Sequence, residues 1–302
     1  MKNEIINLLQ KEGKLSDAID DETDINEFSD TVREIGKQER EHIKSSKILN
    51  NLNTDYTGKN LYVYREVSST NTIAKFLSLN GVENGSVILS ETQTSGRGRS
   101  GKQWESPLGG IWLSIVLNPQ VNHSQIPLIT LATGVAVAKA LEEVGIENPE
   151  IKWPNDVMIN GKKVCGILTE AVTHDNEVEN VIIGVGINAN IDVEEFPRHL
   201  RRTTTTLKAE LNGEVDEHTL IRLFLEEFEK ISELFSHEGF EQILKEWRKR
   251  SYSIGKNVEV RRPYKKSYYG YVVGIDKQGA LIVEKNDGTL KKVISGECII
   301  KN

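Results

Sequence analysis

The stretch SETQTSGRGRSGKQW, residues 90–104, decides how this chain is interpreted. It places three glycines, two arginines and a lysine in front of a tryptophan. A basic stretch of this kind is often a solvated linker. Here GSVILSE precedes it and GIWLSIVLNP follows it, and both have the composition of β-strands. The basic residues therefore lie on a loop that is tethered between two strands.

The composition of this loop favours anion binding over a simple connection. Its glycines permit backbone N–H groups to approach a ligand closely. Arg97 and Arg99 flank Gly98, so both guanidinium groups can reach one anion. The loop matches neither GxxxxGK[ST] nor GxGxxG, which disfavours a standard P-loop or dinucleotide-binding fold.

Length and composition describe a globular protein of about two domains. The chain has 302 residues, of which 37% are hydrophobic and 27% charged. Its longest apolar runs are shorter than the ~20 residues of a membrane span, and the first residues lack a signal-peptide pattern. Cys165 and Cys298 form neither a CxxC pair nor a cluster with histidines, which disfavours zinc and disulfides. We therefore expect a cytoplasmic protein without a membrane segment.

Charge and pattern divide the chain into three parts. Residues 1–57 form an acidic, helical N-terminal segment, in which residues 1–41 carry 12 acidic and 6 basic side chains. Residues 58–252 alternate strand and helix patterns and form the expected catalytic domain. Residues 253–302 carry 10 basic and 5 acidic side chains and show four strand patterns, VEVRRP, YYGYVVGI, GALIVE and TLKKVI, enough for a small closed barrel.

The N-terminal segment reads as short helices. IINLLQ and FSDTVREIGKQEREHI both have apolar residues at helical spacing. A net charge of −6 over residues 1–41 argues against DNA binding, because DNA binding depends on neutralising phosphates.

Four further motifs carry polar residues, and each also has a plain structural explanation. SSTN (68–71) is either a helix cap or a ligand contact. KWPNDV presents Asn155 and Asp156 after a proline, which suits either an Asx-turn or a carboxylate that holds magnesium beside phosphates. The turn NGKK (160–163) predicts a hairpin that carries two lysines, and GVGIN ends a strand with Asn188.

Together these motifs resemble the biotin protein ligase family from about Ile48 to the C-terminus. The resemblance rests on SSTN, QTSGRGRSGKQWESPLGG, KWPNDV, GKKVCGIL and GVGIN, in that order, followed by GIDKQGALIVE. It implies an α+β fold: a class II tRNA-synthetase-like catalytic domain with a mixed, largely antiparallel sheet, plus a C-terminal SH3-like barrel. The short N-terminal segment lacks the convincing winged helix that the repressor members of the family carry.

The resemblance also implies roles for individual residues. The biotin site is lined by Ser69, Thr70, Asn71, Gln93 and Gly96, with Arg97 where biotin meets phosphate. The nucleotide side consists of Gly98 in the loop, Arg99 on the phosphates, Trp104 against the adenine, Gly166 at a close backbone approach, Asn188 facing the adenosine, and Asp156 as a magnesium ligand. Lys163 meets both the biotin carboxylate and the α-phosphate. We expect Lys163, Arg97 and Asp156 to be the catalytic residues.

The implied reaction forms biotinyl-5′-AMP from biotin and ATP with Mg²⁺, then transfers biotin to a lysine of a biotin carboxyl carrier domain. Two alternatives remain open. One is a ligase that also represses transcription, and the other is a lipoate or octanoyl ligase, since those enzymes share a related fold. A homodimer is compatible with the sequence, and DNA is not an expected partner.

Overall fold

The computed structural model describes residue 5 and residues 25–119, 121–262 and 265–301, so most of the helix expected at IINLLQ lies outside the described residues. Two sheets dominate the described part. The first is formed by β1 (Leu61–Val67), β2 (Val87–Gln93), β3 (Ile111–Leu117), β4 (Glu150–Lys152), β5 (Asp156–Ile159), β6 (Lys162–His174) and β7 (Glu177–Ile187). The second is formed by β8 (Asn257–Arg262), β9 (Lys265–Ile275), β10 (Leu281–Glu284), β11 (Leu290–Val293) and β12 (Glu297–Lys301). The helices are α2 (Ile25–Gly36), α3 (Ser45–Leu49), α4 (Thr70–Ser78), α5 (Ile126–Glu143), α6 (Leu207–Leu211), α7 (Glu217–Glu238) and α8 (Glu241–Lys249).

The large sheet has the strand order β1-β2-β3-β7-β6-β5-β4. Only the β1–β2 pair is parallel and the other five pairs are antiparallel, as the prediction of a mixed, largely antiparallel sheet required. The two residues Asn160 and Gly161 close the β5–β6 hairpin, and both have positive φ angles, +50° and +74°. Two positive φ angles in succession are the backbone conformation of an Asn-Gly hairpin turn, so the hairpin predicted from NGKK is confirmed.

Alternation along β3 separates the two faces of this sheet. Ile111, Leu113 and Ile115 belong to the main apolar core, together with residues of α5, α7 and α8. Trp112 and Ser114 point to the opposite face. Helices α4 and α2 cover the β1 end of that second face, and the rest of it is the floor of a cavity.

Helix α5 is the centre of the main core. The segment from His123 to Glu143 is long and apolar enough to span a membrane by length and composition. Its side chains are largely buried, however, and pack against α7, α8 and the sheet. Burial inside the protein accounts for its composition, so it is a core helix.

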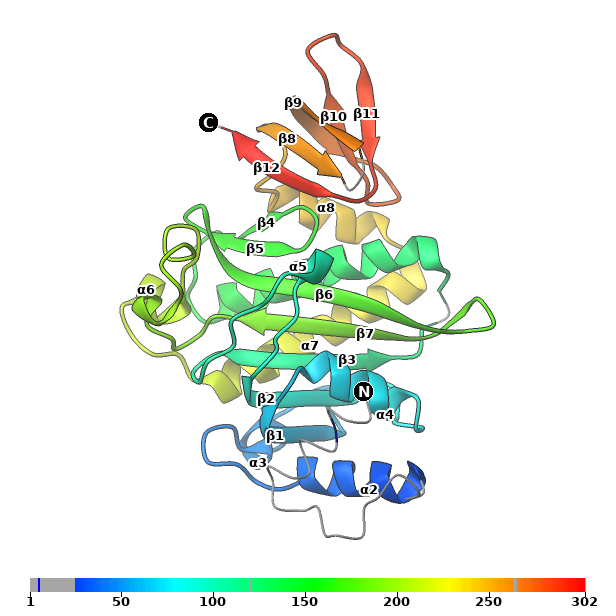
Figure 1. The fold of residues 1–302 in the computed structure, drawn as a ribbon, viewed down its shortest axis with the longest axis vertical. Helices are drawn as coiled ribbons and strands as arrows, with labels where there is room; N and C mark the ends of the chain where they lie inside the picture. Colours follow the sequence, from blue (N-terminus) through cyan, green and yellow to red (C-terminus); the bar gives the residue numbers. More distant parts are fainter. Residues whose placement is uncertain (1–4, 6–24, 120, 263–264, 302) are drawn as a thin grey trace.

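The N-terminal helices pack directly on the catalytic sheet. Helix α2 ends at Gly36, and residues 37–44 are not helical, so the expected continuous helix to residue 43 is wrong. A Cβ at Gly36 would lie 2.7 Å from the hydroxyl of Tyr64, whose O–H donates to the Val32 carbonyl at 2.9 Å. Helix α2 therefore lies against β1 at the end of the molecule opposite the small sheet (Figure 1).

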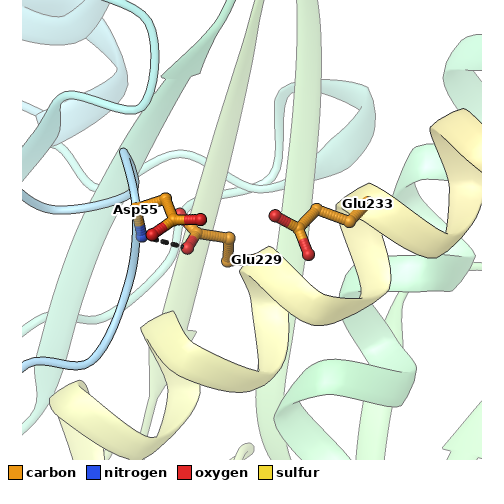
Figure 2. Close-up of side chains that lie close together, drawn as sticks. All are labelled: Asp55, Glu229 and Glu233. Atoms are coloured by element: carbon orange, nitrogen blue, oxygen red, sulfur yellow. Dashed lines mark hydrogen bonds between the residues drawn. The ribbon is translucent and has the colours of Figure 1, made fainter.

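Glu229 on α7 holds the backbone of residues 55–57, where the chain enters the catalytic domain (Figure 2). Its carboxylate accepts hydrogen bonds from the backbone N–H groups of Asp55, Tyr56 (3.1 Å) and Thr57 (2.7 Å). Burial opposes ionisation of Glu229, but these backbone donors outweigh it and lower its pKa. With Asp55 and Glu233 it forms an acidic group, and its own hydrogen bonds explain why it lies there.

The small sheet has five strands, not the four that the sequence predicted. Its order is β11-β10-β9-β8-β12, with β11 and β12 at the edges. The missed strand is β12, which pairs with β8 in antiparallel orientation. Figure 1 shows the small sheet above β4 and β5, and the indole N–H of Trp153 donates to the Gly279 carbonyl at 3.0 Å between the two parts.

Candidate active site

A row of residues in register across four strands lies beneath and beside the cavity, and three of them, Gly186, Gly166 and Asp156, line it. Trp112 pairs with Gly186, Gly186 with Gly166, and Gly166 with Asp156. Because paired residues share one face of a sheet, all four lie on the face opposite the main core. The two glycines leave the middle of that row without side chains.

Trp104 fills the space above the two glycines. A Cβ at Gly186 would lie 2.5 Å from its Nε1 atom, and a Cβ at Gly166 would lie 2.8 Å from its ring. Trp104 also packs edge-to-face against Trp112, with ring centroids 6.4 Å apart. The pair of glycines is therefore what admits an indole at the end of the basic loop, against the sheet.

A β-bulge aims Lys163 into the cavity. Val157 pairs with Cys165, and Met158 pairs with Lys163, so Val164 is the extra residue on β6. Val164 and Cys165 are both fully buried in the main core, whereas Lys163 turns toward the cavity and Lys162 is exposed.

The Lys163 ammonium lies between two side chains. It is 2.6 Å from Asp156 Oδ1, off the hydrogen-bonding direction, and 4.7 Å from the centroid of the Trp104 ring. Its backbone is fixed by N–H donation to the Thr203 carbonyl at 2.8 Å and by acceptance from the Thr205 N–H at 2.9 Å. The cation is thus presented from a rigid strand and is about a quarter exposed, at 27%.

The basic loop folds as a short hairpin over the cavity. Arg97 bridges to Gln103, and the Gly98 N–H donates to the Lys102 carbonyl at 2.7 Å. Gly96 does not line the cavity. Its carbonyl accepts from the Trp104 N–H at 2.8 Å, and a Cβ at this position would meet the Trp104 carbonyl oxygen at 2.3 Å, so Gly96 closes the base of the loop.

Arg99 is half-buried between the loop and the small sheet. It donates to Asn155 Oδ1 at 3.0 Å and to the Gly296 carbonyl at 3.4 Å. Burial lowers its pKa, and Asp156 and Glu297 partly oppose that shift. Both hydrogen-bond partners are neutral, which leaves this guanidinium suited to an anionic ligand.

The start of α4 forms the polar end of the cavity. The Thr70 N–H donates to Gln93 Oε1 at 2.8 Å, and the Ser114 hydroxyl contacts Thr70 Oγ1 at 2.7 Å and Asn71 Oδ1 at 2.6 Å. Ser69 is the N-cap residue, but its hydroxyl makes no capping bond. Of the two roles left open for SSTN, a capping bond from Ser69 is therefore absent: Gln93 accepts from the first turn, and Ser69 lines the cavity.

Asn188 lies at the end of β7 with an open acceptor. Its N–H donates to the Val164 carbonyl at 2.9 Å and its Nδ2 donates to the Thr205 carbonyl at 3.0 Å. Its Oδ1 is buried and has no hydrogen-bond partner in the described structure. A buried orphan acceptor that lines a cavity suits a ligand that donates a hydrogen bond.

The cavity has a volume of about 680 Å³ and collects most of the predicted site residues. Those that line it are Ser69, Thr70, Asn71, Gln93, Arg97, Gly98, Arg99, Trp104, Asp156, Lys163, Gly166 and Asn188. Sequence reasoning missed Asn155 as an Arg99 partner, Glu170 as an Arg97 partner, and the wall that the small sheet supplies through Arg261, Arg262 and residues 296–300. The alternation along β6 could have placed Glu170 on the cavity face, whereas nothing in the local pattern indicates the wall from the small sheet.

Comparisons with known proteins agree with this geometry. The biotin/lipoate A/B protein ligase family matches residues 62–188, and the biotin protein ligase C-terminal domain matches residues 253–301. The bifunctional ligase/repressor BirA of Bacillus subtilis is 36% identical over 256 residues, which cover 84% of this chain and 78% of that protein. The chain belongs to the biotin protein ligase family.

Other relatives cover the same region. The biotin–[acetyl-CoA-carboxylase] ligase of Paracoccus denitrificans is 30% identical over 67% of this chain and 85% of its own length. The biotin protein ligase of Aquifex aeolicus in complex with biotin and ATP superposes with a TM-score of 0.71 and 29% identity, over 80% of this chain and 99% of that one. The predicted family, the α+β fold with a C-terminal SH3-like domain, and the ligase class of enzyme are therefore confirmed.

Proposed function

We propose that this biotin protein ligase activates biotin with ATP to biotinyl-5′-AMP and then transfers biotin to a lysine of a biotin carboxyl carrier domain. One observation carries the proposal: a single cavity holds a polar end at α4, a glycine floor under Trp104, and three cations, Lys163, Arg97 and Arg99.

In the first step, a carboxylate oxygen of biotin attacks the α-phosphorus of ATP. An O–P bond forms, the bond to the β-phosphate breaks, and pyrophosphate leaves. Two anions must meet, and charge develops on the phosphoryl oxygens, so fixed cations are the natural catalysts. Lys163 is held from a strand at the centre of the cavity, and Arg97 and Arg99 approach from the loop above it. We assign Lys163 and Arg97 to the reacting groups and Arg99 to the ATP phosphates.

The remaining contacts sort into the two ends of the cavity. Ser69, Thr70, Asn71 and Gln93 form the polar end, which we assign to biotin. Trp104, over Gly166, is assigned to the adenine, and the open acceptor of Asn188 to the adenosine. Gly98, whose N–H donates to the Lys102 carbonyl, holds the two sides of the loop hairpin together over the cavity.

In the second step, the ε-amine of the carrier lysine attacks the carbonyl carbon of the adenylate. A C–N bond forms, the bond from carbon to the phosphate oxygen breaks, and AMP leaves. The amine must be neutral and must lose a proton, which a nearby carboxylate can accept. Asp156 is the carboxylate that lies beside Lys163 in the cavity, and we assign it this role.

Mg²⁺ fits the site as a companion of ATP. Asp156 supplies one protein carboxylate, and Mg²⁺ is commonly held by one or two carboxylates plus substrate phosphates. The ion would be held chiefly by the phosphates and would neutralise their charge.

The small sheet is proposed to receive the carrier domain. Relatives of this chain include a ligase named for acetyl-CoA carboxylase. Residues 253–302, which contain the small sheet, carry an excess of five positive charges. Several of these charges are already paired, as in Arg261–Glu259 (2.7 Å) and Lys292–Asp276 (2.5 Å). The exposed Lys266 and Lys291 remain available to attract an acidic partner.

Reversal of Lys266 and Lys291 to Glu tests this docking. Transfer to an acidic carrier domain should slow and lose part of its salt dependence, while adenylate synthesis stays normal. Unchanged transfer at every salt concentration would rule out a docking role for these lysines.

The repressor alternative gains support from the Bacillus subtilis relative, which is named a bifunctional ligase/repressor. The acidic N-terminal segment and the packing of α2 on β1 instead support a ligase without DNA binding. Two free, buried cysteines support function in a reducing cytoplasm. A gel shift with the upstream region of the protein's own biotin genes tests the repressor role, and a salt-sensitive, sequence-selective shift would establish it.

The decisive assay for the proposed activity incubates the protein with ATP, Mg²⁺ and a purified carrier domain. Biotin should increase the intact mass of the carrier by one biotinyl group, and lipoate should not. Labelling by lipoate alone would favour the lipoate ligase alternative.

A further inference from the structure

Glu170 on β6 joins the two ends of the cavity. Its Oε2 atom accepts a hydrogen bond from Asn71 Nδ2 at 2.8 Å, and its Oε1 atom accepts one from Arg97 Nη2. Asn71 belongs to the polar end at α4, and Arg97 belongs to the basic loop. One carboxylate therefore holds both groups at once.

The register of the sheet explains how Glu170 reaches them. Glu170 pairs with Ile182, two residues along β6 from the Leu168–Gly184 pair, so it lies on the cavity face of the sheet. A Cβ at Gly184 would lie 2.2 Å from Asn71 Oδ1, so the Asn71 amide rests directly on the bare backbone of β7. Glu170 stands beside that amide.

Asn71 is 4% exposed and has partners on both ends of its amide. Its Oδ1 accepts from the Ser114 hydroxyl at 2.6 Å, and its Nδ2 donates to Glu170 and, at 3.4 Å, to the Leu168 carbonyl. Because Glu170 only accepts, it fixes the amide with the nitrogen toward β6 and the oxygen toward β3.

Arg97 depends on Glu170 in a different way. Its side chain is 46% exposed on a glycine-flanked loop, and Glu170 is its ion-pair partner among the described residues. The guanidinium has five N–H donors, so the bond from Nη2 leaves others for a ligand oxyanion. Glu170 thus holds the half-exposed Arg97 guanidinium toward the α4 end and leaves other N–H donors of the guanidinium unoccupied.

We propose that Glu170 is a positioning residue that presets Asn71 and Arg97 for biotin and couples the biotin end of the cavity to the closure of the basic loop. This inference rests on the proposed function, because it assigns Asn71 to biotin and Arg97 to the reacting anions. Coupling between two ligands is reciprocal, so biotin and ATP should each strengthen the binding of the other through this bridge.

Glu170→Gln is the direct test, because it preserves size but offers one acceptor and one donor. The new –NH₂ group must face either the Asn71 amide nitrogen or the Arg97 guanidinium, both donors, so one of the two bonds is lost. We expect the rate of adenylate formation to fall by about tenfold, with a higher KM for biotin. We also expect the enhancement of biotin binding by a non-hydrolysable ATP analogue to disappear in calorimetry. The matched control is Glu179→Gln, on the exposed part of the same hairpin, which should match wild type.

A double-mutant cycle with Arg97→Ala separates positioning from a purely structural role. If Glu170 acts through Arg97, adding Glu170→Gln to Arg97→Ala should cost less than about twofold further in rate. Fully additive losses, or a Glu170→Gln enzyme with wild-type rate and ligand coupling, would overturn the proposal. Should Glu170→Gln fail to fold, Glu170→Asp replaces it in the same cycle, since the shorter side chain cannot reach both partners. A wild-type protein without biotin-dependent adenylate formation would instead overturn the proposed function itself.

Discussion

Replacement of Lys163 by alanine gives the sharpest single test of the site. The Lys163 ammonium is the cation that the strand β6 holds at the centre of the cavity, 2.6 Å from Asp156 and 4.7 Å from the Trp104 ring centroid. Two unit charges about 4 Å apart attract each other by about 4 kcal/mol at the effective dielectric constant of a protein surface. Removal of one preorganised donor from a developing oxyanion costs a similar ~3 kcal/mol, so the rate of adenylate formation should fall at least about a hundredfold.

The same substitution should affect stability much less. Lys163 and Asp156 are 27% and 21% exposed, so solvent screens the carboxylate that is left without its cation. A single-turnover assay of biotinyl-AMP formation measures the rate, and thermal unfolding confirms that the variant folds. The double variant Lys163→Ala/Asp156→Ala should remain slow, because the missing cation and not the stray carboxylate limits the reaction.

The matched control is Lys162→Ala, one residue earlier on the exposed side of the hairpin. It should stay within about threefold of wild type. Equal losses of activity in Lys162→Ala and Lys163→Ala, or a near-normal rate in Lys163→Ala, would show that Lys163 is not the catalytic cation.

Three further predictions follow from the loop, the floor and the fold. Arg97→Ala should weaken the binding of both biotin and ATP and release free adenylate, whereas Arg99→Ala should raise the KM for ATP more than that for biotin. Equal, small effects of the two substitutions on both substrates would show that the loop only connects two strands. Gly186→Ala places a methyl group 2.5 Å from Trp104 Nε1, so the indole must shift and the KM for ATP should rise by about tenfold with little change for biotin, which steady-state kinetics would measure. The pKa of Glu229 is lowered in the folded protein, so the Glu229 carboxylate stabilises the fold above its unfolded pKa, and this stabilisation is lost as the pH falls through the folded pKa. The difference in Tm between wild type and Glu229→Gln should therefore be large at pH 7 and shrink toward pH 3. A difference in Tm that stays constant with pH would contradict this.

Some elements were predictable because one strong local pattern determines them. The alternating apolar and polar residues of LYVYREV are typical of a strand and form β1 (Leu61–Val67), and the Asn-Gly turn closes the β5–β6 hairpin. The Asp216 carboxylate accepts from the His218 N–H at 3.2 Å at the start of α7, which is the usual role of an aspartate directly before a helical pattern.

Other features depend on contacts that no local pattern records. The choice between Lys162 and Lys163 is made by the bulge at Val164, which two adjacent core residues require. Ser69 reads as a cap, but Gln93 from the neighbouring strand takes over that bond. The alternation along β6 can place Glu170 on the cavity face, but only the three-dimensional structure brings it beside Asn71 and Arg97. In each case tertiary packing overrides the local preference.

The measurement that tests the central claim most directly is ATP–pyrophosphate exchange with biotin and lipoate compared side by side. It reports only the first chemical step, so it requires neither the carrier domain nor the docking surface. The proposed site predicts exchange that depends on biotin and Mg²⁺, is absent with lipoate, and is lost in Lys163→Ala but kept in Lys162→Ala. Exchange supported by lipoate and not by biotin, or exchange that survives in Lys163→Ala, would contradict the account.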